Sequence, residues 1–344
     1  MSELRAICDG RDPSRDGWPT VSVIVPVRDE APHLERAVAS ILDQDYPLPF
    51  DICLAVAPST DGTEQLAARI AAGEPRVSVV DNPAGVTPAG LNAAIRATTG
   101  EVVVRVDGHA ELSAGYIERA VATMCRTGAV NVGGRQIPRP QTRFEEAVAA
   151  ATTSRLGTGG ATYRIGGAEG PVDTVYLGVF DRVAGDTVGW FDESLVRNQD
   201  YELNIRLRAA GGTVWFDPEL GVDYRPRGTW RALAKQYFEY GWWKAEVTRR
   251  HPSSLRVRQV VPPLGLTLMT LASLRGFRRP GWWAVPTLGV AVLVAEATRV
   301  RRRHRARTVD VAMVLATIPV AWSLGLFVGW GTALGRRTGL LRSR

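Results

Sequence analysis

Short apolar runs alternate with amphipathic stretches along the first part of the chain. Four runs are mostly apolar and rich in β-branched residues: VSVIV at 21–25, ICLAV at 52–56, VSVV at 77–80 and EVVVRV at 101–106. Apolar residues recur at helical spacing between them, near 34–42, 63–72 and 87–97. Near-continuous apolar strands separated by amphipathic helices are typical of a mostly parallel sheet with helices on both faces. The pattern therefore predicts a doubly wound α/β fold, in which ligands bind beyond the carboxyl ends of the strands.

The middle of the chain has a less regular pattern. It contains a glycine-rich stretch at 157–167, an apolar strand pattern at 172–180, and helical patterns at 199–210 and 229–247. After His251-Pro252 the chain becomes strongly apolar and rich in arginine. These changes divide the chain into four segments: 1–19, 20–132, 133–252 and 253–344.

Three apolar segments separated by arginine clusters occupy the tail, at 260–274, 282–298 and 309–334. A spanning helix needs about 20 apolar residues, and only the third segment clearly exceeds that length. The first two could span a membrane or lie at its surface as amphipathic elements. Three alternating spans would place arginine clusters outside, against the positive-inside tendency. An arrangement that avoids this keeps the first two segments on the cytoplasmic leaflet and lets the third span or form a hairpin.

The basic charge of the chain is concentrated in this tail. Residues 249–344 contain 17 Arg and only two acids, Glu296 and Asp310, which gives +15. The whole chain has a net charge of +7, so residues 1–248 carry the difference, −8. Because the arginines flank apolar runs, we expect them to meet an anionic membrane and not nucleic acid. The first 19 residues lack the apolar stretch of a secretory signal, so we expect the domain after them to stay on the cytoplasmic side.

A polar triplet, Asp107-Gly108-His109, directly follows the fourth predicted strand. A carboxylate and an imidazole two residues apart in an extended turn can bind one cation, and substrate oxygens can complete its shell. Such ligands suit Mn²⁺ or Mg²⁺, and Gly108 would let a diphosphate approach closely. Alone, the triplet is more typical of an ordinary turn. Its position after a parallel strand favours a site for a metal and a diphosphate.

Several motifs follow one another in a characteristic order between about residues 20 and 260. They are VSVIVPVRDE at 21–30, STDGT at 59–63, PAGLNAAI at 88–95, RVDGHAEL at 105–112, GG at 133–134, VDTVYLGVF at 172–180, RNQDYELNIRLRAAGG at 197–212 and QYFEYGWWK at 236–244. This series resembles the inverting family 2 glycosyltransferases of the GT-A fold, and within them the bacterial exopolysaccharide branch of the succinoglycan type. The resemblance implies an N-terminal extension at 1–19, a donor-binding half at 20–132, an acceptor and catalytic half at 133–252, and a membrane-associated helical tail at 253–344.

The resemblance implies a nucleotide site after the first two strands. In the family, residues after the first strand border the nucleoside, a role that would fall to Pro26, Arg28 and Glu30. Asp61 matches a position near the base, and Asp107 would bind the donor together with the metal. Glu30 and Asp61 also suit helix starts, where acids favour the dipole or cap the backbone, and both interpretations stay open. The family usually has an acid near position 57, where this chain has Ala57-Pro58, so the donor base stays undefined.

Inverting transfer needs a base for the acceptor hydroxyl and an electrophile for the departing diphosphate. The resemblance assigns the base to Asp200, at the start of a predicted helix, where the helix dipole would keep the carboxylate ionised. A helix cap is the alternative role for this residue. Relatives usually have Glu at position 199, so we expect Gln199 to alter contacts with the acceptor. Arg197 and Asn198 would position the acceptor or a phosphate.

The aromatic helix at 229–247 resembles the family segment that closes over the donor or acceptor. The resemblance implies acceptor or diphosphate contacts for Gln236, Tyr240 and Lys244. Trp242 and Trp243, which lie close to the apolar tail, equally suit an aromatic belt at a membrane interface.

Together these features predict a glycosyltransferase of the hexosyltransferase type that uses a nucleoside-diphosphate sugar and Mn²⁺ or Mg²⁺. Its acceptor would be a hydroxyl of a membrane-linked glycan or lipid in cell-surface polysaccharide synthesis, on the cytoplasmic side of a bacterial plasma membrane. Two alternatives stay open. One is a synthase that charges polyprenyl phosphate with a sugar, and the other is a non-catalytic glycan-binding or scaffold protein of the same fold, motivated by Ala57 and Gln199.

Overall fold

The computed structural model describes residues 17–337, which divide into two compact units. Within the described part, the first unit comprises residues 17–137 and 166–224, and the second comprises residues 138–165 and 225–337. The compact units differ from the expected segments, because strands from both the expected donor half and the expected acceptor half share the sheet of the first unit. The assignment of those halves to donor and acceptor stays a prediction. The N-terminal extension lies largely outside the described residues.

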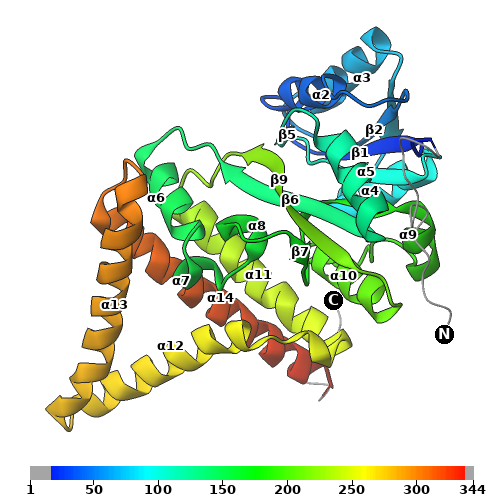
Figure 1. The fold of residues 1–344 in the computed structure, drawn as a ribbon. Coiled ribbons are helices and arrows are strands. Elements are labelled where there is room, and N and C mark those ends of the chain that lie inside the picture. The colour runs from blue at the N-terminus through cyan, green and yellow to red at the C-terminus, as the bar shows by residue number, and fades with distance from the viewer. Residues whose placement is uncertain (1–16, 338–344) are drawn as a thin grey trace. The chain divides into compact units, whose positions relative to one another are not determined.

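The first unit is built on one mixed sheet (Figure 1). Its strands are β1 (Val21–Val27), β2 (Asp51–Val56), β3 (Val77–Asp81), β4 (Val102–Arg105), β5 (Glu111–Leu112), β6 (Asn131–Pro138), β7 (Gly170–Pro171), β8 (Tyr176–Asp181) and β9 (Val214–Tyr224). They lie in the order β3-β2-β1-β4-β8-β6-β9-β5, and β7 pairs with β9. The first four are parallel, as predicted. Beyond β4 the sheet continues with antiparallel pairs, β4 with β8 and β8 with β6.

Helices cover both faces of this sheet. They are α2 (Leu34–Leu42), α3 (Thr63–Gly73), α4 (Thr87–Arg96), α5 (Tyr116–Thr127), α9 (Arg182–Val188) and α10 (Gln199–Ala209). Successive side chains of a strand point to opposite faces, so Val23 and Val25 join one apolar cluster with Leu34 of α2, while Ile24 joins another with Leu91 of α4 and Leu203 of α10. This two-sided burial explains the continuous apolar runs and confirms the predicted α/β fold.

The second unit is helical. Its α-helices are α6 (Arg143–Thr152), α7 (Arg155–Thr158), α8 (Thr162–Ile165), α11 (Trp230–Arg250), α12 (Val257–Gly276), α13 (Ala284–Val300) and α14 (Thr308–Arg337), joined in part by the short 3₁₀ turns η1 (Pro252–Ser254), η2 (Pro280–Trp283) and η3 (Arg301–Arg303). The glycine-rich stretch at 157–167 forms the end of α7 and all of α8. The apolar core of the second unit brings Val148 of α6 and Leu233 of α11 together with Val314 and Ile318 of α14.

Helices α11 and α14 approach each other closely at two glycines. A Cβ atom on Gly241 would lie 2.0 Å from the Trp322 carbonyl oxygen, and one on Gly325 would lie 2.0 Å from the Phe238 carbonyl oxygen. Any larger residue at either position would force the helices apart. Segment 309–334 therefore contributes one continuous helix that is packed into this unit, despite Pro319, and does not form the hairpin considered from its sequence.

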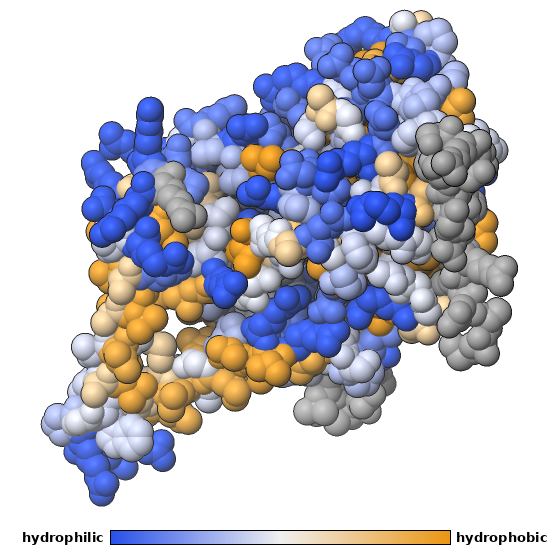
Figure 2. All heavy atoms as spheres, viewed as in Figure 1, coloured by the Kyte–Doolittle hydropathy of each residue, from blue (hydrophilic) through white to orange (hydrophobic). Residues whose placement is uncertain are grey.

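The apolar tail exposes much of its surface. Among the described residues, two helical segments are long and apolar enough to cross a membrane by length and composition, Pro280–Val300 and Thr308–Thr332. They differ in packing, because 11% of the first apolar window is buried inside the protein and 44% of the second. Figure 2 shows apolar side chains gathered along α12 and α13 at the lower left. Segment Pro280–Val300, which the sequence analysis left as either a spanning or an interfacial element, is thus the more exposed of the two candidate membrane spans.

Candidate active site

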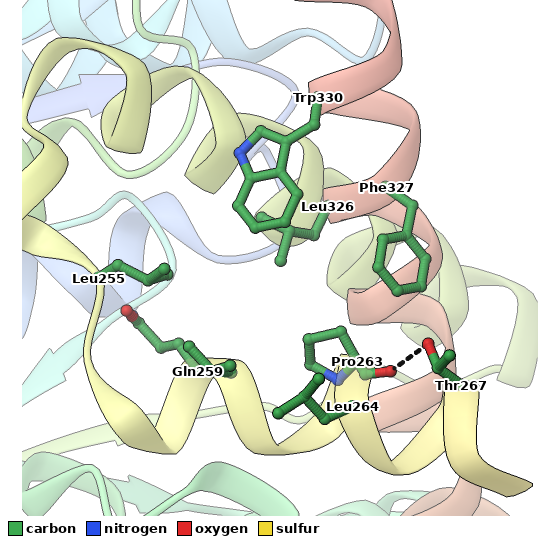
Figure 3. Close-up of a pocket in the computed structure, with 9 residues that line it drawn as sticks. Leu255, Gln259, Pro263, Leu264, Thr267, Leu326, Phe327 and Trp330 are labelled. Carbon is green, nitrogen blue, oxygen red and sulfur yellow. Dashed lines mark hydrogen bonds between the residues drawn. The ribbon is translucent and has the colours of Figure 1, made fainter.

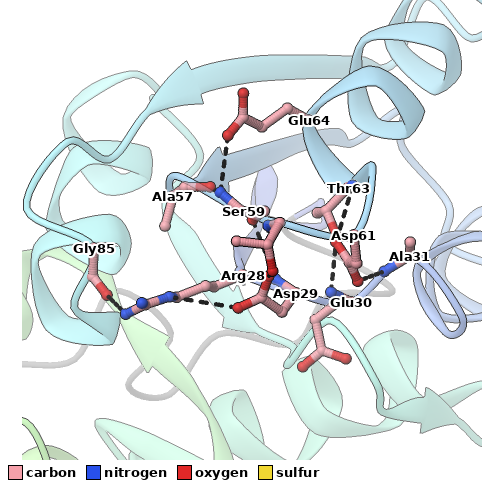
Figure 4. Close-up of polar contacts among 11 residues, drawn as sticks. Arg28, Asp29, Glu30, Ala31, Ala57, Ser59, Asp61, Thr63, Glu64 and Gly85 are labelled. Carbon is pink, nitrogen blue, oxygen red and sulfur yellow. Dashed lines mark hydrogen bonds and ion pairs between the residues drawn. The ribbon is translucent and has the colours of Figure 1, made fainter.

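Loops after β1 and β2 are tied together by Asp61 (Figure 4). Its carboxylate accepts hydrogen bonds from the backbone N–H of Ala31 at 3.0 Å, the N–H of Thr63 at 3.1 Å and the Thr63 hydroxyl at 2.5 Å. The Thr63 hydroxyl contributes most to holding the pKa of Asp61 below its ordinary value. The N-cap of α3 is Gly62, so Asp61 does not cap this helix as one of its two possible roles required. It instead locks the turn before α3 to the neighbouring loop, and its place near the base stays a prediction.

The same rim is extended by Arg28 and Asp29. Asp29 adopts a left-handed backbone with φ of 51°, and its carboxylate accepts hydrogen bonds from the N–H of Thr60 at 2.8 Å and from its hydroxyl at 3.2 Å. Arg28 is 60% exposed and donates to the Gly85 carbonyl at 2.9 Å, so it reaches the loop after β3. Loops after three adjacent parallel strands therefore share one polar edge, as the fold predicts for a ligand site.

Position 57 offers no carboxylate to a base. Ala57 is buried, its N–H donates to the Val27 carbonyl, and its own carbonyl accepts from the Ser59 hydroxyl at 2.8 Å. Pro26, which was predicted to border the nucleoside, lies in β1 and pairs in register with Ala55 of β2. The backbone of this region is thus fully engaged in the sheet and the adjoining loop.

The Asp107-Gly108-His109 turn packs against Glu30. The His109 Nδ1 atom lies 2.7 Å from the Glu30 Oε1 atom. A Cβ atom on Gly108 would lie 3.1 Å from Glu30 Cγ and 3.6 Å from the Pro26 carbonyl oxygen. The glycine therefore lets the turn approach Glu30, which is a different reason from the diphosphate contact expected from the sequence.

Arg105 joins the two carboxylates that the sequence placed in the chemistry. Its buried guanidinium donates to Asp107 Oδ1 at 2.9 Å from Nη2 and at 3.2 Å from Nε. Its Nη1 atom donates to Asp200 at the start of α10. The β4 strand and the α10 helix thereby bring residues 95 positions apart into one ion-paired cluster.

The charges of this cluster shift its two acids in opposite directions. Burial by itself would raise the pKa of Asp107, but Arg105, with His109 and Arg197, outweighs it and holds the pKa below its ordinary value. Burial raises the pKa of Asp200, and the charge of Asp107 adds to that effect against the influence of Arg105. Desolvation thus opposes the helix dipole that was expected to keep Asp200 ionised, and the pKa of Asp200 lies above its ordinary value. The role of Asp200 as the base stays a prediction.

Residues 197–200 form the entry to α10. Asn198 takes a left-handed conformation with φ of 61° directly before the helix, and Gln199 is the first helical residue and is buried. Arg197 lies close enough to Asp107 to lower its pKa. The structure thus brings Arg197 and Asp200 near Asp107, and the roles of these residues stay predictions.

Three predicted residues lie on α11 of the second unit. Gln236 donates to the Tyr240 hydroxyl at 3.1 Å. Lys244 is buried, and its ammonium donates to the Ser254 carbonyl at 3.0 Å and to the Ser254 hydroxyl at 3.2 Å. These contacts hold the turn after α11, so Lys244 has a structural role that the sequence did not indicate. Its proposed contact with a diphosphate stays a prediction.

The sequence missed Arg105 and Tyr176 as members of the site. Arg105 ends an otherwise apolar, buried strand, and a charge in that position was a usable signal of a buried ion pair. Tyr176 starts β8, and burial together with the charge of Asp107 raises its pKa well above the ordinary value. No local pattern marked Tyr176, because only the antiparallel pairing of β8 brings it near β4.

The metal prediction can be tested against these contacts. Among residues 17–337, no group of three or more His, Cys, Asp or Glu side chains is arranged to hold a metal ion. Asp107 and His109 would therefore supply two ligands, and substrate oxygens the rest. Metal-ligating imidazoles commonly pair their second nitrogen with a carboxylate, as His109 pairs Nδ1 with Glu30. An ionised Asp107 and a ring held in this way fit a divalent cation that is bound largely through a diphosphate.

The fold is of the GT-A type. A solved structure with a similar fold is a mannosyltransferase from Pyrobaculum calidifontis in complex with GDP-Man and Mn²⁺, with a TM-score of 0.64, 19% identity, and coverage of 90% of this chain and 88% of that one. Residues 22–188 match the sequence profile of the family described as glycosyl transferase family 2. The chain is 30% identical to the succinoglycan biosynthesis protein ExoA of Rhizobium meliloti (strain 1021) over 89% of its length and 93% of the relative. It therefore belongs to glycosyl transferase family 2.

A second relative has a more specific name. The chain is 21% identical to the dolichyl N-acetyl-alpha-D-glucosaminyl phosphate 3-beta-D-2,3-diacetamido-2,3-dideoxy-beta-D-glucuronosyltransferase of Methanococcus voltae, over 67% of this chain and 74% of the relative. Membership of glycosyl transferase family 2 confirms the prediction that this chain is a glycosyltransferase.

Proposed function

We propose that this protein transfers a sugar from a nucleoside-diphosphate sugar, with inversion, to a hydroxyl of a lipid-linked glycan or lipid during exopolysaccharide synthesis. The observation that carries the proposal is the cluster in which Arg105 joins Asp107 and Asp200 beside the donor-side loops. The succinoglycan protein supports a role in exopolysaccharide synthesis, and the dolichyl-linked substrate in the name of the second relative supports a lipid-linked acceptor.

The donor site lies at the carboxyl ends of the parallel strands. Arg28, Glu30 and Asp61 border the nucleotide, on loops that hydrogen bonds hold together before any ligand arrives. A cation such as Mn²⁺ or Mg²⁺, bound by Asp107 and His109, would neutralise charge that develops on the departing diphosphate. Glu30 orients the His109 ring, and Arg197 adds positive charge beside Asp107.

Asp200 is the base of the proposed reaction. Its carboxylate takes the proton of the acceptor hydroxyl while that oxygen forms a bond to the anomeric carbon of the donor sugar. The bond from that carbon to the diphosphate oxygen breaks at the same time and its electron pair leaves with the nucleoside diphosphate, so a single displacement inverts the carbon. A raised pKa suits this role, because a base is most effective when its pKa lies near the working pH.

The tail holds the protein at a membrane. Exposed apolar side chains continue along α12 and α13, including Leu264, Leu271 and Leu288. Arginines lie in the last turn of α12 and just after it, at Arg275, Arg278 and Arg279. Apolar helices bordered by arginine suit a bilayer with anionic lipid at its cytoplasmic face. An enzyme held there meets a lipid-linked acceptor directly.

The test measures release of nucleoside diphosphate and formation of glycosylated lipid by the full chain in lipid nanodiscs. A panel of nucleoside-diphosphate sugars is offered with Mn²⁺ and a polyprenyl-diphosphate-linked sugar. Asp200→Asn should lower kcat by roughly 10²–10⁴-fold, while Glu118→Gln, an exposed acid on α5, should leave it unchanged. Full activity of Asp200→Asn would remove this residue as the base. If the enzyme transfers the sugar to polyprenyl phosphate and not to the lipid-linked sugar, it is instead a synthase that charges polyprenyl phosphate with a sugar.

A further inference from the structure

Helices α12 and α14 of the second unit line an apolar cavity of about 120 Å³ that is open on one side (Figure 3). Its walls include Val260, Pro263, Leu264, Leu326, Phe327 and Trp330. An apolar cavity of about 150 Å³ in a protein interior stays dry and accepts a ligand the size of benzene. The space between α12 and α14 is therefore large enough for a short stretch of hydrocarbon, and its lining offers water little reason to enter.

The two polar residues at this cavity turn their polar atoms to their own helix. The Thr267 hydroxyl donates to the Pro263 carbonyl at 2.8 Å, as Figure 3 shows. The Gln259 Oε1 atom accepts from the Arg256 backbone N–H at 3.0 Å, a capping contact at the start of α12. The Thr267 hydroxyl and the Gln259 Oε1 atom thus make hydrogen bonds within α12 and at its start. The rest of the lining is apolar, so the cavity favours an apolar occupant.

The cavity opens onto the exposed apolar stripe of α12. Positions 257, 261, 264, 268 and 271 follow a spacing of three and four residues, so their side chains lie on one helix face. Leu264 belongs to this stripe, is 63% exposed and also lines the cavity. Phe327 and Trp330, on the opposite wall, are exposed as well. A hydrocarbon chain in the bilayer that covers this stripe can therefore enter the cavity from the side.

Two arginines lie at the start of α12, the helix that supplies one wall of the cavity. Arg256 and Arg258 flank the start of α12 and are sequence neighbours of the lining residues Leu255 and Gln259. Cationic side chains and the start of a helix both favour a phosphate. An apolar cavity beside a helix start that carries two arginines suits a molecule that has a phosphate head and a hydrocarbon chain.

We propose that this cavity binds a segment of the polyprenyl chain of the lipid-linked acceptor. The inference rests on the proposed function, since it names where that acceptor is held. The small volume suits a short, methyl-branched stretch of one chain, whereas the rest of the chain stays in the bilayer. Binding of this kind gives the enzyme a preference for acceptors with a long prenyl chain and does not affect the donor.

Photolabelling in nanodiscs tests where the chain lies. A polyprenyl phosphate carrying a diazirine near the phosphate should label peptides that contain residues 255–267 and 326–330, and unlabelled polyprenyl phosphate should reduce the labelling. A phosphatidylglycerol with a diazirine in its acyl chain is the comparison. Equal labelling of these peptides by both probes, or labelling only elsewhere, would overturn the assignment to a prenyl chain.

Kinetics with matched variants test what the cavity does. Leu264→Trp places a larger ring at the cavity, and Leu268→Trp makes the same change at a position that is 55% exposed and does not line it. We expect Leu264→Trp to raise the KM for a long-chain acceptor about tenfold, with little change in the KM for a short-chain acceptor or for the donor. Leu268→Trp should match the unchanged enzyme, and Phe327→Ala, which removes one wall, should again raise the long-chain KM.

These outcomes separate the inference from the proposed function. Absence of sugar transfer to either acceptor by the unchanged enzyme would contradict the proposed function. Transfer to both acceptors with the same KM values in Leu264→Trp, Phe327→Ala and the unchanged enzyme would contradict only the cavity assignment.

Discussion

The imidazole of His109 lies 2.7 Å, from Nδ1 to Oε1, from the carboxylate of Glu30. The two residues come from loops after β4 and β1, which are adjacent parallel strands. A carboxylate in this position fixes the ring of a ligating histidine and raises its basicity. In the proposed metal site, Glu30 would therefore hold the ring of the His109 ligand, while its nucleoside contact stays a prediction.

We predict that Glu30→Gln weakens binding of Mn²⁺ by about 10–100-fold, the usual effect of removing a carboxylate behind a metal ligand. Binding is measured by electron paramagnetic resonance of free Mn²⁺ in the presence of nucleoside diphosphate, without turnover. Glu35→Gln, an exposed acid on α2, serves as the control. Unchanged Mn²⁺ affinity in Glu30→Gln would show that Glu30 does not support a metal site.

Arg105 should control both stability and the pH dependence of the reaction. Arg105→Met leaves Asp107 and Asp200 without their shared cation, and breaking a buried ion pair costs about 3 kcal/mol or more. Asp200 is 36% exposed, so we expect the lower end of that range. Chemical denaturation measures this loss. Arg76→Met, which removes a surface ion pair with Glu74, should have a far smaller effect.

The same variant should shift the acid limb of the rate profile. The base works when ionised, so kcat/KM rises with pH as Asp200 loses its proton, and the raised pKa places this limb above the ordinary aspartate range. Arg105 lowers that pKa, so Arg105→Met should move the limb to higher pH. A limb that stays in place would mean that another group controls it.

The parallel half of the fold could be predicted from sequence because its strands are buried on both faces. Residues such as Val23 and Ile24 face different clusters, which produces a continuous apolar run that local pattern detects. The antiparallel half could not be predicted in the same way. The pairing of β4 with β8 joins segments about 75 residues apart, and no periodicity encodes such a contact.

The site shows the same division between local and long-range information. Asp107, His109 and Asp200 were predictable because each lies in a short motif at a strand or helix end. Their coupling through Arg105 was not, because it depends on where α10 docks against β4. The sign of the pKa shift at Asp200 also depends on burial, which the helix-start position alone does not reveal.

Asp61 allows a test of its loop-locking role. Asp61→Asn keeps one acceptor oxygen and loses the charge that receives the bonds from Ala31 and Thr63, so we expect a lower Tm at neutral pH. The folded protein holds the pKa of Asp61 below its ordinary value, and its stabilising effect is therefore present above about pH 4 and is lost as pH falls further. The Tm difference between the two proteins should shrink below about pH 4. A difference that is constant with pH would contradict this role for the charge.

The two apolar helices of the tail should respond differently to a charge. Leu288 on α13 is 67% exposed, and an arginine in the middle of a spanning or embedded helix costs about 2.5–3.5 kcal/mol of membrane insertion. We predict that Leu288→Arg reduces flotation of the protein with anionic vesicles while its Tm in detergent is unchanged. Val314 on α14 is fully buried against the second core, so Val314→Arg should unfold this unit before it affects membrane binding. Val79→Arg, at an exposed apolar position of β3, controls for added charge. If Leu288→Arg floats as well as the unchanged protein, α13 does not hold the enzyme at the bilayer, and the exposed apolar side chains of α12 and α14 must do so.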